Sequence, residues 1–416
     1  MFTFVYTQNN YIKAADMEEL MLTRLNQKNG DSLSILGFGC MRFPIKGGNI
    51  DMPRSIAMIR DSIDKGVNYF DTAYFYHNGK SESLLGEALS GGYRERVKIA
   101  TKLPPFLVKK LDNAKKIFAT QLEKLQTNYI DYYLLHMLTD KATFDRMVNI
   151  GVVKWLESLK KEGTIKNIGF SFHGSKADFE DIVQAYPWDF CQIQYNYMDE
   201  NNQATKSGLQ LAAKLGIPVI VMEPLRGGRL VNNLPERVLK TFKSYDKDRS
   251  PAEWALRWIW NHPEVNVVLS GMSTEEQVAD NIRIACNAEA NSFTEEELLV
   301  FKKVKSVMAE LIKVPCTGCG YCMPCPAGVN IPGCFSSYNE KYLLDSKLAW
   351  WKYMQTLGAM SEKPANASQC KECGKCESHC PQHISIRKEL KTVSKEMEGI
   401  FYKPIVGIGR KILKIK

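Results

Sequence analysis

The sequence contains no apolar run close to the roughly 20 residues that a membrane-spanning helix needs. No signal peptide is visible either, because the apolar stretch at residues 2–6 is short and no basic region precedes it. With 44% hydrophobic and 24% charged residues, the composition is neither collagen-like nor of low complexity. These absences exclude fibrous, disordered and membrane-bundle classes. We expect a cytoplasmic protein of two to three domains, or one large barrel with an appendage.

The sequence also lacks an aromatic-interleaved basic stripe, which argues against nucleic acid as a partner. The formal net charge is +9, and residues 386–416 hold nine Lys/Arg and three Glu. We expect a basic C-terminal tail there. It is either solvated or a docking surface for an acidic partner, such as ferredoxin or another small electron carrier.

The cysteines are unevenly placed, since nine of the twelve lie between Cys316 and Cys380. In a cytosolic chain, this concentration is more typical of metal binding than of disulfides. The two motifs are Cys316-x2-Cys319-x2-Cys322-x2-Cys325-Pro326 and Cys370-x2-Cys373-x2-Cys376-x3-Cys380-Pro381.

These paired runs resemble the bacterial two-cluster ferredoxin, in which the fourth cysteine of each run ligates the other cluster. The resemblance implies two [4Fe–4S] clusters, held by Cys316, Cys319, Cys322 and Cys380, and by Cys370, Cys373, Cys376 and Cys325. The first run has two rather than three residues before its last cysteine, which leaves Cys334 as an alternative to Cys325. Zinc remains the main alternative metal, although zinc does not require three cysteines at this spacing plus a Cys-Pro in both runs.

Short β-rich runs alternate with amphipathic runs between about residues 34 and 290. We expect strands at 34–40, 67–71, 97–101, 130–135, 165–170, 190–194, 218–222 and 265–269. We expect helices at 54–65, 82–90, 112–126, 144–161, 176–185, 204–215, 251–261, 274–287 and 294–312. Eight strand–helix units predict an α/β fold, a (β/α)8 TIM barrel. A doubly wound sheet is the alternative, but Gly37-Phe38-Gly39 does not complete its dinucleotide-binding pattern.

The expected organisation has four parts. Residues 1–22 form an N-terminal extension, with Met17 or Met21 as a candidate native start. Residues 23–312 form the barrel, 313–385 an α-helical ferredoxin-like two-cluster domain, and 386–416 the basic tail.

Four ionisable residues are expected at one rim of this barrel, because active sites lie at the C-terminal ends of barrel strands. Asp71, Lys102 and His136 end the second, third and fourth strands, and Tyr76 follows shortly after Asp71. Each alone could be a cap, a solvated charge or a packed core residue. Together they indicate a catalytic constellation.

Several stretches carry a resemblance to a known family. They are Gly66–Ala73 with Tyr76 and Ser81-Glu82, Lys102, Tyr129–His136, Gly169–Ser171, Gln192 with Tyr195-Asn196, Pro224–Gly228 and Gln277–Asn281. On these residues the chain resembles the aldo-keto reductases over about residues 23–290. With the cysteine motifs included, it resembles the iron–sulfur branch of that family found in anaerobic microbes.

The resemblance implies an oxidoreductase that reduces a small carbonyl substrate, or oxidises an alcohol, with NADP(H) or NAD(H). It implies that Tyr76 is the general acid and that Lys102 lowers the pKa of Tyr76. Asp71 would hold Lys102 in place, and His136 would donate to the carbonyl oxygen. The clusters would serve electron transfer or structure.

The resemblance also implies a set of cofactor-binding positions: Ser171, Gln192, Met222, Leu225, Arg226, Gly271, Gln277 and Asn281. Ser171 and Gln192 match carboxamide contacts, and Asn281 matches an adenine contact. Met222 replaces the aromatic ring that stacks on nicotinamide. Gly271 and Gln277 stand where Lys and Arg usually grip the 2′-phosphate, which leaves NADH and NADPH open. Arg226 and Arg229 either grip the pyrophosphate or lie on a solvated loop.

Two other functions stay open. Nicotinamide moves two electrons as hydride, whereas a cluster moves one at a time, so a ferredoxin-linked electron-transfer enzyme with a flavin or another cofactor in the barrel mouth is the first alternative. No flavin motif is evident. The second, a binding scaffold without catalysis, would not require the complete set of four rim residues.

Overall fold

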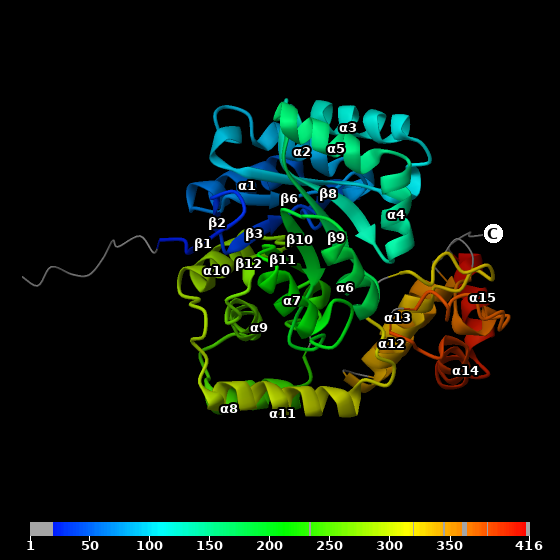
Figure 1. Cartoon of the computed structure of the whole chain (residues 1–416). Coiled ribbons are helices and arrows are strands. Elements are labelled where there is room, and N and C mark those ends of the chain that lie inside the picture. The colour runs from blue at the N-terminus through cyan, green and yellow to red at the C-terminus, as the bar shows by residue number, and fades with distance from the viewer. Residues whose placement is uncertain are drawn as a thin grey trace, which may run out of the picture.

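The protein consists of a closed barrel of parallel strands and a smaller helical unit beside it (Figure 1). This computed structural model describes residues 20–232, 234–318, 320–343, 346–359, 364–380 and 382–412. Most of the expected N-terminal extension, with Met17, lies outside the described residues, as do Cys319 and Pro381.

The barrel confirms the expected (β/α)8 architecture. Its strands follow the spatial order β10-β11-β12-β3-β6-β7-β8-β9, and every neighbouring pair is parallel. They are β3 (Leu36–Gly39), β6 (Tyr69–Asp71), β7 (Lys98–Leu103), β8 (Ile130–Leu138), β9 (Ile165–Phe172), β10 (Phe190–Gln194), β11 (Val219–Met222) and β12 (Val265–Ser270). Their side chains are almost all buried, as in strands that helices cover.

Helices surround the barrel with their apolar faces inward. They are α1 (Met52–Asp64), α2 (Ser81–Ala88), α3 (Leu111–Leu125), α4 (Lys141–Asn149), α5 (Val152–Glu162), α6 (Lys176–Gln184), α7 (Thr205–Lys214), α8 (Glu236–Tyr245), α9 (Pro251–Trp260), α10 (Glu275–Cys286) and α11 (Glu295–Leu311). The expectation of one continuous helix over 144–161 was wrong. Gly151 adopts φ 82° and separates α4 from α5, a backbone conformation that glycine adopts without steric cost. Helix α8 was not expected.

A two-stranded hairpin closes the N-terminal end of the barrel. It pairs β1 (Thr23–Leu25) with β2 (Ser32–Ser34). Leu33 packs into the apolar interior between the strands, beside Tyr69, Tyr132 and Phe190. The strands finish at the opposite end, which we call the mouth of the barrel. A second hairpin, β4 (Ile45–Lys46) with β5 (Asn49–Ile50), follows the first barrel strand.

The C-terminal unit has a hydrophobic core of its own. Its helices are α12 (Ile331–Leu343), α13 (Ser346–Met354), α14 (Ile386–Met397) and α15 (Tyr402–Ile412). We expect a basic tail from residue 386, but Leu390, Val393 and Met397 of α14 and Val406 of α15 are buried in this core. Residues 386–412 are therefore part of the folded unit. Among the described helices, none is long and apolar enough to cross a bilayer.

Candidate functional site

Asp71, Tyr76, Lys102 and His136 meet at the barrel mouth, as the sequence predicts. The Lys102 ammonium donates to Asp71 Oδ1 at 2.6 Å and to the Thr72 carbonyl at 2.7 Å. The same ammonium lies 4.9 Å from the centre of the Tyr76 ring. The rings of Tyr76 and His136 are 6.2 Å apart at an angle of 78°. Three neighbouring strands, β6, β7 and β8, thus bring the four groups together.

Burial controls the charges of this tetrad. Burial raises the pKa of Tyr76, and the nearby Lys102 charge offsets only part of that rise. Lys102 thus lowers the pKa of the phenol as expected, but the effect of burial is larger and the net shift is upward. Burial lowers the pKa of Lys102, but the charges of Asp71 and Tyr76 outweigh it, and the net shift is upward. Lys102 is held as a cation directly beneath the phenol.

His136 is the neutral member of the group. Burial lowers its pKa well below the ordinary value, and the charges of Lys102 and His173 add to this effect. Its Nδ1 atom is buried and has no hydrogen-bond partner within the part of the chain that the structure describes. A buried polar atom without a partner is costly, and such atoms often mark a functional site.

Ser171, Gln192 and Met222 lie on the adjacent strands β9, β10 and β11. Ser171 is paired in register with Gln192. The Gln192 amide donates to the Met222 sulfur at 3.5 Å, and Gln192 Oε1 is buried without a partner among the described residues. The Ser171 hydroxyl accepts from the backbone of Met137 at 2.8 Å. The structure therefore gathers the expected carboxamide contacts on one wall of the mouth, next to His136.

The two arginines of the loop after β11 have different surroundings. Arg226 makes a bidentate ion pair with the buried carboxylate of Asp199, at 2.6 and 2.7 Å. Arg229 reaches away from the barrel and donates to Ser336 Oγ at 3.3 Å. Leu225 is partly buried against the main core. The charge of Arg226 is thus already paired, between the loops that follow β10 and β11.

The remaining expected cofactor positions lie after β12. Asn281 is buried and donates to Ser270 Oγ at 2.9 Å. Gln277 is exposed and accepts from the backbone of Ser273 at 2.8 Å, ahead of α10. Gly271 lies under the side chain of Arg42, since a Cβ atom at residue 271 would come within 3.1 Å of Arg42 Cδ. Arg42 therefore spans the loops that follow β3 and β12.

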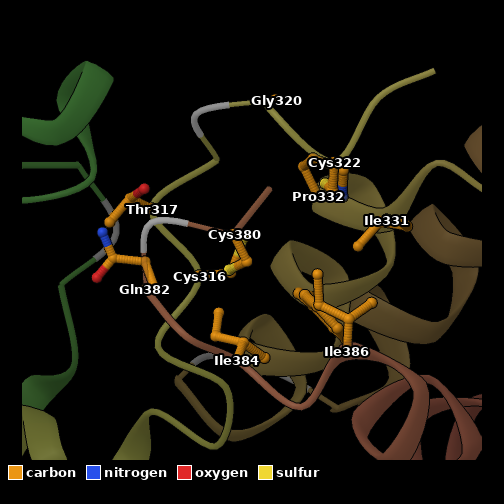
Figure 2. A pocket seen from close by; sticks show the side chains of 11 residues that line it. Cys316, Thr317, Gly320, Cys322, Ile331, Pro332, Cys380, Gln382, Ile384 and Ile386 are labelled. Carbon is orange, nitrogen blue, oxygen red and sulfur yellow. The ribbon is translucent and has the colours of Figure 1, made fainter. Parts of the chain in front are cut away.

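In the C-terminal unit, the thiols of Cys316, Cys322 and Cys380 line one small cavity, which we name the inner cradle (Figure 2). The rest of its wall is mainly apolar and includes Ile331, Phe335, Ile384 and Ile386. Figure 2 shows Cys316 and Cys380 side by side, although they come from different runs. This is the grouping that cross-ligation between the runs requires, and Cys319 lies outside the described residues.

The thiols of Cys325, Cys370 and Cys376 form a second group, the outer cradle. Burial raises the pKa of Cys376, and proximity to Glu377, Cys370 and Cys325 adds to the rise. Cys373, in the same run, is exposed. Cys325 also lies close enough to Cys334 to contribute to the raised pKa of that thiol. Cys334 is buried beside Tyr353, so the structure brings both candidate fourth cysteines near the second run.

The inner cradle is suited to an iron–sulfur cluster rather than to a single ion. Among the described residues, no three His, Cys, Asp or Glu side chains are close enough to hold one metal ion. The thiols of Cys316, Cys322 and Cys380 instead border a mainly apolar cavity. In each run a backbone N–H donates to the first sulfur, from Gly318 to Cys316 and from Glu372 to Cys370, both at 3.4 Å. Hydrogen bonds to cysteine sulfur are a recurring feature of cluster-binding loops.

Comparison with protein families agrees with both parts of this geometry. Residues 35–298 match the aldo/keto reductase family, and residues 315–384 match the 4Fe-4S dicluster domain. The chain belongs to the aldo/keto reductase family. It is an oxidoreductase of the aldo-keto reductase type that carries a ferredoxin-like 4Fe-4S domain at its C-terminal end.

Relatives of this aldo-keto reductase cover the barrel. L-galactose dehydrogenase of Arabidopsis thaliana is 25% identical over 289 residues, which span 65% of this chain and 89% of the relative. A solved aldo-keto reductase of Bacillus halodurans is 27% identical and covers 68% of this chain and 96% of its own, with a TM-score of 0.58. An aldo-keto reductase of Klebsiella pneumoniae, solved with NADP and acetate, is 23% identical over 69% of this chain and 96% of its own (TM-score 0.56) and shows the shared fold.

Sequence reasoning missed two residues at the mouth of this aldo-keto reductase, and the contact that one of them makes with the C-terminal unit. Arg42 follows the first barrel strand, and a cation just after a barrel strand could have indicated a residue of the active-site rim. His173 follows β9 directly, and its ring lies 5.8 Å from that of Tyr321 in the C-terminal unit. No spacing in the sequence predicts this contact, because it depends on how the two parts pack.

Proposed function

We propose that the barrel reduces a small carbonyl compound, or oxidises the corresponding alcohol, with a nicotinamide nucleotide. The observation that carries the proposal is the placement of the Tyr76 phenol over the buried Lys102–Asp71 pair, next to neutral His136. A phenol with a fixed cation beneath it and a hydrogen-bond donor beside it suits protonation of a carbonyl oxygen.

The roles of the four residues follow from their charges. Tyr76 donates its proton to the carbonyl oxygen, and Lys102 stabilises the phenolate that remains. Asp71 fixes the position of the ammonium through the 2.6 Å contact. Neutral His136 donates a ring N–H to the same oxygen and orients the carbonyl group.

The nucleotide fits the wall next to the tetrad. A bound nicotinamide supplies or accepts the hydride. Ser171 and Gln192 would hold its carboxamide, and the buried, unpartnered Gln192 Oε1 is suited to accept from an amide N–H. Met222 would face the ring, and Arg42 would face the phosphates. The Klebsiella relative, which shares this fold, was solved with NADP.

The test of this function is Tyr76→Phe, with Tyr74→Phe as the matched control on the same loop. Assays use anaerobically purified protein, NADH and NADPH, and a panel of aldehydes and ketones. Loss of a general acid predicts a 10²- to 10⁴-fold decrease in kcat for Tyr76→Phe. Nucleotide Kd, measured by fluorescence quenching, should stay within about twofold. Unchanged kcat in Tyr76→Phe overturns the proposed mechanism, and a bound flavin in the purified protein favours the ferredoxin-linked alternative.

We propose further that the C-terminal unit holds two [4Fe–4S] clusters. One is held by Cys316, Cys319, Cys322 and Cys380, and the other by Cys370, Cys373, Cys376 and Cys325. The grouping of Cys316 and Cys322 with Cys380 in one cavity supports the exchange of the fourth cysteine between runs. Iron and sulfide analysis should give eight of each per chain. Cys316→Ser and Cys373→Ser should each lose about half of the iron and sulfide. Loss of all iron in both variants would contradict two separate sites.

A further inference from the structure

The ring of His173 joins the barrel to the inner cradle. His173 follows the last residue of β9, and Tyr321 precedes the cradle ligand Cys322. Their ring centres lie 5.8 Å apart with an interplanar angle of 64°, an edge-to-face contact. Pairs at this distance and angle contribute a specific attraction beyond their burial. The contact links a strand end of the catalytic barrel to the loop that carries Cys316 and Cys322.

The barrel holds this histidine firmly. His173 Nδ1 is 3.1 Å from Gln203 Oε1, and the Gln203 amide donates to Gln194 of β10. The next residue, Gly174, packs so closely on the loop after β8 that a Cβ atom there would fall 1.8 Å from the Thr139 carbonyl oxygen. The ring therefore presents a fixed edge to Tyr321.

A second contact sits on the loop after β11. Arg229 donates to Ser336 of α12, the helix that also contributes Ile331 and Phe335 to the cradle wall. A Cβ atom at Gly318 would lie 3.5 Å from Arg229 Nη1, so the cysteine loop itself touches this arginine. In Figure 2 the side chains of Thr317 and Gln382 point toward the ribbon of the barrel.

The two contacts flank one strand. His173 lies after β9 and Arg229 after β11, and β10 with Gln192 runs between them. The inner cradle thus stands over the wall that we assign to the nicotinamide ring. Cysteines of both cradles pack against the C-terminal core, and Cys373, in the same run as Cys370 and Cys376, is exposed. The charge of His173 also reaches the tetrad, since it contributes to the lowered pKa of His136.

We propose that the His173–Tyr321 contact couples the inner cradle to the nucleotide site, so that nucleotide binding shifts the reduction potential of the inner cluster and leaves the outer cluster unchanged. The proposal rests on the proposed function, because it needs a nucleotide at the mouth. A ligand shifts a potential only if it binds the oxidised and reduced forms with different affinity. The contact holds the inner cradle against the nucleotide wall. An added electron in the cradle then repels an anionic nucleotide, so binding should lower the potential, and losing the contact should weaken this repulsion. A tenfold difference in affinity corresponds to about 59 mV for one electron.

The test uses holoprotein and the tetrahydro analogues of NADH and NADPH, which neither give nor accept hydride. The Kd of each analogue is measured first by fluorescence. Redox titrations followed by electron paramagnetic resonance then give both cluster potentials with and without saturating analogue. Cys316→Ser and Cys373→Ser assign the two signals to the inner and outer clusters. Tyr321→Leu removes the ring contact, Tyr321→Phe retains it, and His173→Asn removes it from the barrel side while keeping a donor for Gln203.

We expect a downward shift of tens of millivolts in the signal that Cys316→Ser removes. In Tyr321→Leu and His173→Asn, the potential shift should fall to less than a third of the wild-type shift, with iron content unchanged. In Tyr321→Phe, the shift should persist. A full shift in Tyr321→Leu, an equal shift in both clusters, or no shift despite measured binding overturns the proposal and leaves the proposed function intact. If neither analogue binds, the proposed function fails, and the coupling fails with it.

Discussion

The ammonium of Lys102 lies 2.6 Å from a carboxylate oxygen of Asp71, and the exposed fractions of the two side chains are only 1% and 4%. Removing one partner leaves a buried charge without compensation, which costs about 3–5 kcal/mol in other proteins. We expect Asp71→Asn to lower the thermal midpoint strongly. The double variant Asp71→Asn with Lys102→Met should recover much of that loss, although neither protein is active.

The Lys102–Asp71 pair also predicts that the stability deficit of Lys102→Met depends on pH, which scanning calorimetry can detect. Burial raises the pKa of Asp71 even beside Lys102. In Lys102→Met the carboxyl group can therefore take up a proton and become neutral, and the stability deficit of this variant should shrink as the pH falls. Strictly additive losses in the double variant would contradict an ion pair that acts as a unit.

Arg42 is the cation best placed to meet the nucleotide phosphates. Its neighbour Arg226 is committed to Asp199, whereas the Arg42 side chain is exposed and lies across Gly271 and Gly227. A hydrogen bond to a charged group contributes about 1.5–3 kcal/mol, so Arg42→Ala should weaken nucleotide binding about 10- to 100-fold. The control is Arg237→Ala. Arg237 is an exposed arginine of α8 that pairs with Glu310 of α11, and its loss should leave Kd unchanged. Equal Kd values for both variants would place the phosphates elsewhere.

His173 should contribute to acid sensitivity. Burial lowers its pKa to about 4, and the hydrogen bond with Gln203 opposes this shift. Because the unfolded histidine has a pKa near 6.5, the unfolded state binds more protons between pH 6.5 and 4, and stability falls as the pH falls through that window. The loss from this residue between pH 7 and pH 5 is about 2 kcal/mol.

The matched variant is His173→Asn, which cannot take up a proton in this range. The thermal midpoint of His173→Asn minus that of wild type should be larger at pH 5 than at pH 7. Iron content is checked at each pH. His136 is near enough to feel the charge of His173, so its own signal is followed by nuclear magnetic resonance. A parallel pH dependence in the two proteins would show that His173 does not titrate as expected.

The barrel was predictable because its strands are short apolar runs between amphipathic helices, and each of the eight expected strands overlaps an observed one. The tetrad was predictable because the strand ends of a barrel converge on one rim, independent of the sequence and conformation of the loops. The break between α4 and α5 at Gly151 was not predictable, because the helical pattern of apolar residues continues across it. Only the φ of 82° at Gly151 separates the two helices. Likewise, the basic residues of α14 suggest a tail, although Leu390, Val393 and Met397 share one buried face.

Other features depend on packing that no local pattern encodes. The commitment of Arg226 to Asp199 needs the loops after β10 and β11 to meet. The contact between His173 and Tyr321 needs the C-terminal unit to dock on the mouth. The net rise in the pKa of Tyr76 depends on the depth of burial, which residue types alone do not give.

The exposed lysines of α14 lead to a last prediction, that an acidic electron carrier docks on the C-terminal unit. Lys388 and Lys395 are exposed on the face opposite the buried Leu390 and Val393, next to the run that carries the exposed Cys373. Opposite charges accelerate association, and salt reduces this acceleration. Lys388→Glu with Lys395→Glu should therefore slow cluster reduction by reduced ferredoxin about tenfold at low salt.

The control for this experiment is Lys154→Glu with Lys161→Glu, which makes the same charge change on exposed positions of α5 in the barrel. Stopped-flow absorbance follows cluster reduction at several ionic strengths, and dithionite, a small reductant, provides the reference rate. The difference between the two double variants should disappear at high salt, because the Debye length falls to about 3 Å at 1 M. Equal slowing by both double variants would reflect net charge alone and would argue against docking on α14.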